Sequence, residues 1–350
     1  MTEKLRVGIA GYGVVGRRRR LHIDKHPSLR VVAVSEVTLG RDGVLPDGAR
    51  HYADYRDLIA KEKLDVLFVS LPNHLAADAT VRGLTKGLHT FCEKPPGRDL
   101  ADVARVRAAE RRRPRLKLKY GFNHRYHDSV RDALEIIRSG RLGRILNLNG
   151  VYGKSHIIPF DKGWRAQRRY AGGGILLDQG IHMVDLMRLF AGDFASVSSV
   201  VSNAYWKHDV EDNAYALMKT KTGVVALMHS SATLWRHRFN LDITLEKGSL
   251  TLAGILSGSK SYGAETLTTA VAAKNDSGDP AETITRYNED NSWRDEIVEF
   301  ADCVLKNKRV RHGDSKDALK TMELIYRIYC ADLAWKKKYR LSDRVPKGTR

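Results

Sequence analysis

The chain has 350 residues, of which 42% are hydrophobic and 29% are charged, as is ordinary for a soluble globular protein large enough for two domains. It contains no run of 18 apolar residues, which argues against a membrane-spanning helix, and its first residues do not resemble a secretory signal. The cysteines, Cys92, Cys303 and Cys330, are far apart, which disfavours a disulfide framework or a zinc site. We therefore expect a cytoplasmic protein.

The formal net charge is +19, and basic runs occur at residues 17–20, 111–113 and 336–338. Nucleic-acid binding is one interpretation, but the runs are dispersed and no helix-turn-helix, zinc-finger or RNP motif accompanies them. A solvated basic surface is the favoured interpretation, so we expect neither a nucleic-acid nor a membrane partner. A third interpretation is a positive field that attracts an anionic, phosphate-bearing small molecule.

The first third of the chain alternates short apolar runs with helical patterns. Continuous apolar strands that alternate with helices indicate a parallel sheet covered on both faces. The predicted strands are Leu5–Ala10, Val31–Ser35, Asp65–Leu71, His89–Cys92 and Leu116–Tyr120, and the predicted helices end near His26 or span about His74–Lys86 and Asp99–Arg113.

The pattern changes near residue 125. A helix is predicted over about Ser129–Ser139, and strand-like segments separated by turn residues then dominate, which indicates antiparallel strands of a second domain. These segments are Arg144–Tyr152, Ala195–Tyr205, Ala214–Lys219, Val224–Ser231, Phe239–Glu246 and Ser249–Leu252. Two predicted helices, about Ser292–Leu305 and Ser315–Lys336, close the chain.

A glycine-rich turn follows the first predicted strand. In VGIAGYGVVG, Gly11, Gly13 and Gly16 have the spacing that allows a tight turn, close approach to a pyrophosphate and close helix–strand packing. Glu36 ends the second strand 20 residues after Gly16, where a carboxylate can accept hydrogen bonds from the adenosine ribose. These features predict a dinucleotide site; the alternative is a glycine turn without a ligand and an incidental acid.

Two other motifs lie at the carboxyl ends of predicted parallel strands, where ligands of such folds bind. In FCEKPPG, Pro95 restricts Lys94 to an extended backbone, which fixes the direction of the lysine at this edge. The alternative is a surface lysine in a turn. In SLPNHL, Asn73 either caps the following helix or lines the nicotinamide ribose site.

The segment AGGGILLDQGIHMVDLMRLF carries polar side chains in an otherwise apolar helix. On a regular helix Asp178, His182 and Asp185 fall within one narrow stripe. One explanation is a satisfied internal Asp–His pair with a structural role. The other is that the stripe faces a cavity, in which His182 exchanges a proton and Asp178 orients it. The preceding residues 172–174 are glycines, which would let the backbone approach a cofactor or substrate closely.

The loop over residues 153–174 is rich in Lys, Arg, Trp and His and leads directly into this helix. Its substrate-pocket candidates are Lys154, Trp164, Arg165 and Arg169, and an exposed basic loop is the alternative for each of them. No ligand cluster is visible in the sequence, so we expect no metal.

The glycine motif, then Glu93-Lys94-Pro95, then Gly-Gly-Gly followed by Asp178, His182 and Asp185, occur in an order and at separations that resemble the Gfo/Idh/MocA oxidoreductases. This is the family of glucose–fructose oxidoreductase and inositol dehydrogenase, and the resemblance covers essentially the whole chain. It implies an α/β fold with an N-terminal Rossmann NAD(P)-binding domain over residues 1–124. It also implies a C-terminal α+β substrate-binding and oligomerisation domain over residues 125–350, with a large open, mostly antiparallel sheet.

The resemblance implies hydride transfer between nicotinamide and a secondary alcohol or ketone of a sugar, a sugar derivative such as a nucleotide sugar, or inositol. The implied catalytic residues are Lys94, which contacts the reacting hydroxyl, His182, which exchanges its proton, and Asp178, which positions substrate and orients His182. The expected cofactor residues are Gly11, Tyr12, Gly13, Val14, Val15, Gly16, Glu36, Leu71, Pro72, Asn73, His74, Glu93 and Lys94. The expected substrate residues are Lys94, Arg125, Lys154, Trp164, Arg165, Arg169, Asp178 and His182.

NAD is the expected cofactor because Glu36 would repel a 2′-phosphate, although Thr38 and Arg41 leave NADP as an alternative. The basic loop slightly favours a phosphate- or nucleotide-bearing sugar. The expected partner is a second copy, in a homodimer or homotetramer formed through the C-terminal sheet. Two other functions on this fold stay open: an NAD-dependent glycosidase and a non-catalytic NAD(P)-sensing regulator.

Overall fold

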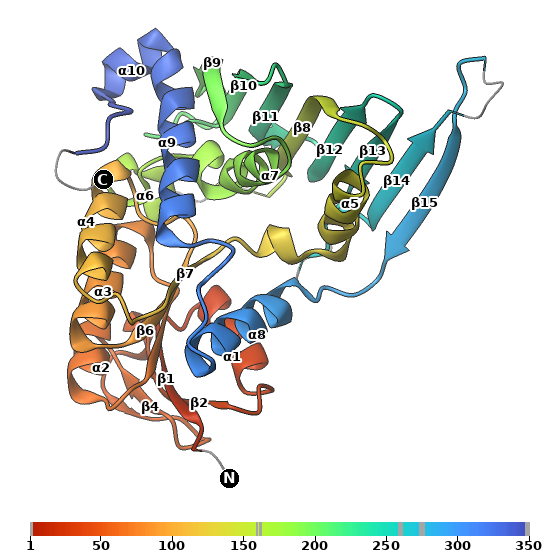
Figure 1. Cartoon of the computed structure of the whole chain (residues 1–350). Helices are drawn as coiled ribbons and strands as arrows, with labels where there is room; N and C mark the ends of the chain where they lie inside the picture. The colour runs from red at the N-terminus through yellow and green to blue at the C-terminus, as the bar shows by residue number, and fades with distance from the viewer. Residues whose placement is uncertain (1–2, 159, 161–162, 258–261, 273–276, 347–350) are drawn as a thin grey trace.

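The computed structural model describes residues 3–158, 160, 163–257, 262–272 and 277–346 (Figure 1). Two sheets organise the chain: a seven-stranded sheet built by the first third and an eight-stranded sheet built by the remainder. Among the described residues, no helix is both long and apolar enough to cross a membrane.

The first sheet has the order β3-β4-β2-β1-β5-β6-β7, and every pair is parallel except β3 with β4. Without β3, the parallel strands follow the 3-2-1-4-5-6 order of a dinucleotide-binding Rossmann fold. Its strands are β1 Leu5–Ala10, β2 Leu29–Ser35, β3 Gly43–Val44, β4 Arg50–Tyr52, β5 Val66–Val69, β6 His89–Glu93 and β7 Leu118–Gly121. Its helices are α1 Val14–Ile23, the short η1 Val37–Leu39, α2 Tyr55–Lys61, α3 Asn73–Lys86 and α4 Leu100–Arg111.

The second sheet has the order β15-β14-β13-β12-β8-β11-β10-β9, and only the β8–β11 pair is parallel. Its strands are β8 Ile145–Ser155, β9 Phe194–Ser202, β10 Asn213–Thr220, β11 Val225–Leu234, β12 Arg238–Leu245, β13 Gly248–Ala253, β14 Glu265–Val271 and β15 Ala281–Tyr287. Its helical segments are η2 Asn123–Tyr126, α5 Asp128–Arg138, η3 Trp164–Ala166, α6 Arg168–Ala171, the π-helical turn η4 Leu176–Gly180 and α7 Ile181–Ala191. Helices α5 and α7 cover one face of this sheet (Figure 1).

The closing helices are α8 Ser292–Leu305, α9 Ser315–Ala331 and α10 Leu333–Tyr339, and they tie the two sheets together. Helix α8 packs on α1, and α9 contacts α4 and β7 on one side and α7 and β9 on the other (Figure 1). The prediction of one continuous helix over 315–336 is wrong, because the chain leaves the helix at Asp332. Its carboxylate caps α10 by accepting a bond from Trp335 N at 2.9 Å. The boundary at residues 124 and 125 stays a prediction.

The basic run at residues 17–20 is only partly a solvated surface. Arg19 is fully buried in α1, and its guanidinium pairs with Glu93 at 2.6 Å and with Glu296 of α8 at 2.7 Å. A buried guanidinium requires such partners, so the two carboxylates explain why this arginine can lie inside. The interpretation of the run as solvated is therefore wrong for Arg19.

Candidate active site

The glycine turn between β1 and α1 is shaped by contacts that leave no room for side chains. Gly11 has a φ of 92°, and a Cβ added there would lie 2.5 Å from Ser70 O. A Cβ on Gly16 would lie 2.0 Å from Gly11 O, whereas one on Gly13 would meet nothing closer than Glu36 Oε2 at 3.7 Å. Gly11 and Gly16 thus serve the turn itself, and Gly13 keeps the N-terminus of α1 open to a pyrophosphate.

Glu36 lies beside this turn at the carboxyl end of β2. Its carboxylate accepts a hydrogen bond from Thr38 N at 3.4 Å, and its Oε2 lies 3.7 Å from the position of a Cβ built on Gly13. The other predicted residues of this segment border the same turn: Val14 is 80% exposed, and Tyr12 and Val15 are half-buried. This edge therefore fits the adenosine half of a dinucleotide.

The segment after β5 connects the two sheets. Leu71 and Pro72 are half-buried at the carboxyl edge, and Pro72 occupies the N-cap position of α3. Asn73 does not cap the helix; its Nδ2 donates to Ala171 O at 2.7 Å, so its amide holds the segment before α7. The ring of His74 packs against Tyr170, with centroids 4.8 Å apart.

Lys94, Asp178 and His182 come together in one cavity of about 410 Å³. Lys94 follows β6 of the first sheet, whereas the other two lie on η4 and α7 against the second sheet. The cavity is therefore assembled between the two sheets. The lining residues are Lys94, Tyr152, Lys154, Phe160, Arg165, Asp178, Gln179 and His182.

The Asp178 carboxylate is surrounded by three cations. Oδ2 lies 3.1 Å from Lys154 Nζ, and Oδ1 lies 3.8 Å from Lys94 Nζ and 3.9 Å from Arg165 Nε. Burial alone would raise the pKa of Asp178, but these cations together lower it below its ordinary value. Lys94 Nζ also donates to the backbone carbonyl of Asp178, and burial lowers the pKa of this ammonium group. Asp178 is therefore an anion at neutral pH.

His182 is held by ring stacking and not by Asp178. Its imidazole stacks on that of His124, with centroids 3.7 Å apart and planes 13° apart, and its buried Nδ1 has no hydrogen-bond partner among the described residues. The expected Asp178–His182 bond is not formed; the Asp178 carboxylate instead pairs with Lys154 at 3.1 Å and lies 3.8 Å from Lys94. Burial, with Lys94 and His127, lowers the pKa of His182 well below 6.5, so the ring is neutral and can accept a proton.

His124 is fixed on its other side by the wall of the cavity. Its Nδ1 lies 3.3 Å from Asn123 Oδ1, and its Nε2 lies 3.2 Å from the hydroxyl of Tyr152. If Nδ1 carries the proton toward the Asn123 oxygen, the Tyr152 hydroxyl donates to Nε2. The sequence prediction did not include His124, Tyr152, Phe160 or Gln179. Tyr152 could have been found, because it lies two residues before Lys154 on β8 and strand side chains alternate between faces.

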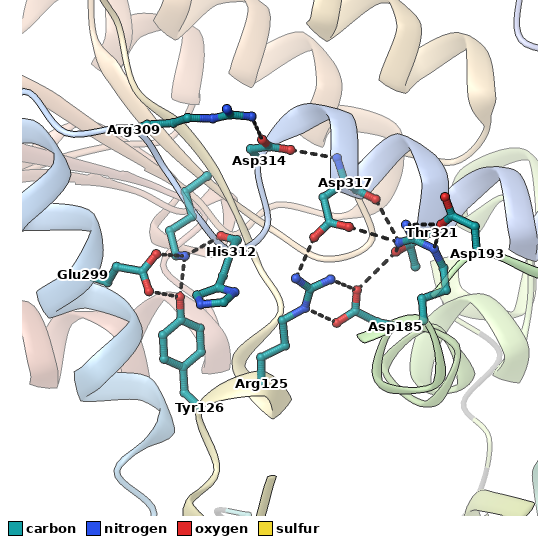
Figure 2. Close-up of polar contacts among 12 residues, drawn as sticks. Arg125, Tyr126, Asp185, Asp193, Glu299, Arg309, His312, Asp314, Asp317 and Thr321 are labelled. Carbon is teal, nitrogen blue, oxygen red and sulfur yellow. Dashed lines mark hydrogen bonds and ion pairs between the residues drawn. The ribbon is translucent and has the colours of Figure 1, made fainter. Parts of the chain in front are cut away.

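Arg125 was predicted to bind substrate, but it is not among the residues that line the cavity. Its guanidinium is buried and donates to Asp185 at 2.6 and 2.5 Å, with a further ion pair to Asp317 at 2.6 Å (Figure 2). Two carboxylates thus occupy its donors, and it joins η2 to α7 and α9. Asp185, the third member of the predicted polar stripe, therefore faces this ion network and not the cavity.

Three other predicted site residues point elsewhere. Trp164 is half-buried and supports the Arg165 guanidinium, which lies 4.3 Å from the centre of its ring, without itself lining the cavity. Arg169 is exposed and donates to Gln167 Oε1 at 3.1 Å. Glu93 accepts from Arg19 at 2.6 Å, so its carboxylate joins β6 to α1. Within the loop that supplies Trp164 and Arg169, residues 159, 161 and 162 lie outside the described residues.

The glycines at 172–174 do not face a ligand. Added Cβ atoms would lie 2.1 Å from Arg98 O at Gly172, 2.2 Å from Tyr329 Oη at Gly173 and 2.0 Å from Glu211 O at Gly174. The missing side chains allow this segment to pack against protein on three sides. Close approach to a cofactor or substrate stays a prediction. In the described part of the chain, no group of three or more His, Cys, Asp or Glu residues could hold a metal ion.

Comparison with known families decides the classification. Residues 5–122 match the model of an oxidoreductase family with an NAD-binding Rossmann fold, and residues 130–251 match the Gfo/Idh/MocA C-terminal domain. The chain belongs to the Gfo/Idh/MocA family of oxidoreductases. It is therefore an NAD(P)-dependent oxidoreductase with an NAD-binding Rossmann domain, as the sequence predicted.

Curated relatives of this oxidoreductase are distant. It is 29% identical over 201 residues to 1,5-anhydro-D-fructose reductase of Ensifer adhaerens, a match that spans 55% of the chain and 58% of that protein. It is 28% identical over 268 residues to inositol 2-dehydrogenase of Salmonella typhimurium, with 72% and 75% covered.

Solved structures support the fold. The complex of levoglucosan dehydrogenase with NADH and levoglucosan superposes with a TM-score of 0.83 at 20% identity, covering 95% of this chain and 98% of that one. The myo-inositol 2-dehydrogenase of Lactobacillus plantarum superposes with a TM-score of 0.77 at 23% identity, with 95% and 98% covered. The prediction of a Rossmann domain followed by a domain with a mostly antiparallel sheet is confirmed.

Proposed function

We propose that this oxidoreductase transfers a hydride between NAD(H) and a secondary alcohol or ketone of a sugar, a sugar derivative or an inositol. The observation that carries the proposal is the cavity in which Lys94, Asp178 and His182 meet. Lys94 follows a parallel strand, as the glycine turn does, so both lie at the sheet edge where ligands of such folds bind. The names of the relatives, which act on inositol and 1,5-anhydro-D-fructose, point to the same substrate class.

The cavity supplies the two groups that alcohol oxidation needs beside the cofactor. The glycine turn between β1 and α1 would hold NAD, which would supply the hydride acceptor. The neutral imidazole of His182 takes the hydroxyl proton, and the Lys94 ammonium group donates a hydrogen bond to the same oxygen as negative charge develops. Asp178 accepts hydrogen bonds from a neighbouring hydroxyl and keeps Lys94 and Lys154 in place.

A screen of sugars, inositols and nucleotide sugars with NAD⁺ and with NADP⁺ tests this function. We expect net formation of reduced cofactor with at least one polyol or sugar, and a higher kcat/KM for NAD⁺, because Glu36 would bond the ribose hydroxyls and repel a 2′-phosphate. Absorbance of the reduced nicotinamide is the measurement. Glu36→Ala should reduce the difference in kcat/KM between NAD⁺ and NADP⁺.

Each opposing result favours a different function. Cleavage of glycosides without net NADH formation would favour an NAD-dependent glycosidase. Binding of NAD with neither reaction would favour a sensing regulator. A clear preference of the unaltered protein for NADP⁺ would overturn the role given to Glu36.

We also propose that the outward face of the second sheet joins two copies of the chain. The exposed apolar side chains of this face lie on three neighbouring strands and are Val200, Tyr215, Leu217, Val225 and Leu227. Leu217 and Leu227 are direct cross-strand neighbours at 52% and 48% exposure. Such a contiguous apolar patch is typical of an interface.

Sedimentation velocity should therefore give a dimer or tetramer that Leu217→Glu with Leu227→Glu dissociates, because charges would be buried at the interface. The matched control is Leu305→Glu, which changes a leucine of similar exposure, 48%, on α8. A monomer at micromolar concentration, or an assembly that the double change leaves intact, would contradict this proposal.

A further inference from the structure

The charges that line the catalytic cavity do not balance. Among the lining residues that the structure describes, the cations are Lys94, Lys154 and Arg165, and Asp178 is the sole acid. His182 is neutral because its pKa is lowered, so the cavity carries an excess of two positive charges. A neutral polyol would leave this excess uncompensated.

The excess is concentrated on the side of the cavity formed by Lys154 and Arg165. Lys94 is the most enclosed of the three cations, with 19% of its side chain exposed, and its Nζ is already bonded to the backbone of Asp178. Lys154 and Arg165 are 35% and 51% exposed. Their donors are therefore more accessible to a ligand than the Lys94 ammonium group.

The Arg165 guanidinium is positioned by Trp164 but makes only a long ion pair with Asp178. Its nearest described carboxylate oxygen is Asp178 Oδ1 at 3.9 Å, which is longer than a hydrogen bond. The face of its guanidinium rests on the Trp164 ring at 4.3 Å, so the donor edge is left for another group. A planar guanidinium with free donors matches the two oxygens of a carboxylate or phosphate.

We propose that Lys154 and Arg165 form a subsite for one anionic substituent, a carboxylate or a phosphate, on the sugar or cyclitol that is oxidised. This inference rests on the proposed function, because it names the class of substrate for the same cavity. The cavity of about 410 Å³ lies toward the lower end of the roughly 300–1,000 Å³ typical of small-molecule sites. That volume favours a monosaccharide with a single anionic group over a nucleotide sugar.

The first test is binding, which does not require turnover. Calorimetric titration of the NAD⁺-saturated protein compares glucuronate, glucose 6-phosphate, inositol 1-phosphate, glucose and myo-inositol. We expect at least one anionic compound to bind about tenfold or more tightly than its neutral counterpart, since charge-assisted hydrogen bonds carry the difference. The carboxylate and the phosphate probes distinguish the two chemistries.

The second test uses variants. Arg165→Gln and Lys154→Met should each weaken binding of the anionic compound about tenfold or more, and should weaken binding of the neutral counterpart by a clearly smaller factor. The matched control is Arg112→Gln, which removes one positive charge from an exposed position outside the cavity and should change neither affinity. A loss of both affinities in equal measure would assign the two cations to holding Asp178 and would overturn the subsite.

The outcomes separate this inference from the proposed reaction. Tight binding of an anionic compound without any reduction of NAD⁺ would support the subsite and overturn the proposed reaction. Oxidation of neutral sugars without any preference for anions would support the reaction and overturn the subsite. A similar weakening of anion binding by Arg112→Gln would attribute the preference to the overall charge of +19 and would also overturn the subsite.

Discussion

His182→Ala and Lys94→Ala are each expected to lower kcat by about 100-fold or more with the substrate saturating. A hydride leaves a carbinol carbon only as the hydroxyl proton leaves, and a positioned base typically contributes about 10²–10⁴-fold to such a step. His182 is the neutral imidazole in the cavity, and Lys94 is the enclosed cation that can stabilise charge on the same oxygen. Steady-state and single-turnover kinetics are the measurements.

The pH dependence of kcat/KM distinguishes a catalytic role of His182 from a purely structural one. Because burial and the charge of Lys94 lower the pKa of His182 below 6.5, the base of the unaltered enzyme should stay unprotonated into acidic solution. Lys94→Met removes the positive charge and should raise this pKa, so residual activity should be lost at a higher pH on acidification. If Lys94→Met does not shift the pH at which kcat/KM falls on acidification, the charge of Lys94 does not control the pKa of His182.

NAD binding is the control for both changes. It should survive His182→Ala, since the cofactor rests mainly on the glycine turn between β1 and α1. Near-normal kcat in either variant would remove that residue from the mechanism. If His182→Ala fails to fold, His182→Phe, which keeps a ring to stack on His124, separates packing from proton transfer.

The N-terminal domain could be predicted, except for β3, β4 and α2, because its signals are local. Apolar runs bounded by glycines set the parallel strands, and the GxGxxG spacing reflects contacts such as that between Gly16 and Gly11 O. Strands β14 and β15 were missed because their sequences, ETLTTAV and AETITRY, are polar. Six of the seven residues of β15 are exposed, so burial imposes no apolar alternation there.

The sequence predicted several of the residues that meet in the candidate site, but not how they contact one another. The family resemblance implied that Lys94, Asp178 and His182 share one site, and the structure brings all three to one cavity. The π-helical turn over residues 176–180, however, was not predicted, because the sequence pattern indicates only a regular helix there. The partner of His182 is His124, a residue far away in the sequence, and long-range contacts of this kind leave no periodic signal.

Arg125→Met is expected to lower the free energy of unfolding by about 3–5 kcal/mol. This is the usual cost of removing one partner of a buried ion pair. The change leaves Asp185, which is 1% exposed, with only the Thr321 hydroxyl at 3.2 Å as a donor from the network in Figure 2. Asp317 still pairs with Arg188 at 3.1 Å, so the carboxylate that loses its partner is mainly that of Asp185 on α7. Chemical denaturation monitored by circular dichroism is the measurement.

Two variants show whether the buried charge causes this loss. Asp185→Leu added to Arg125→Met removes the stranded carboxylate and should recover part of the stability, which a double-mutant cycle quantifies. The surface control is Arg144→Met, because Arg144 is 82% exposed and pairs with Glu246 at 2.7 Å; it should cost at most about 1 kcal/mol. An equally small cost for Arg125→Met would mean that Asp185 is stabilised without its guanidinium partner. Since Asp185 lies one turn after His182 on α7, a folded Arg125→Met protein should also lose kcat, because the catalytic ring shifts with the helix.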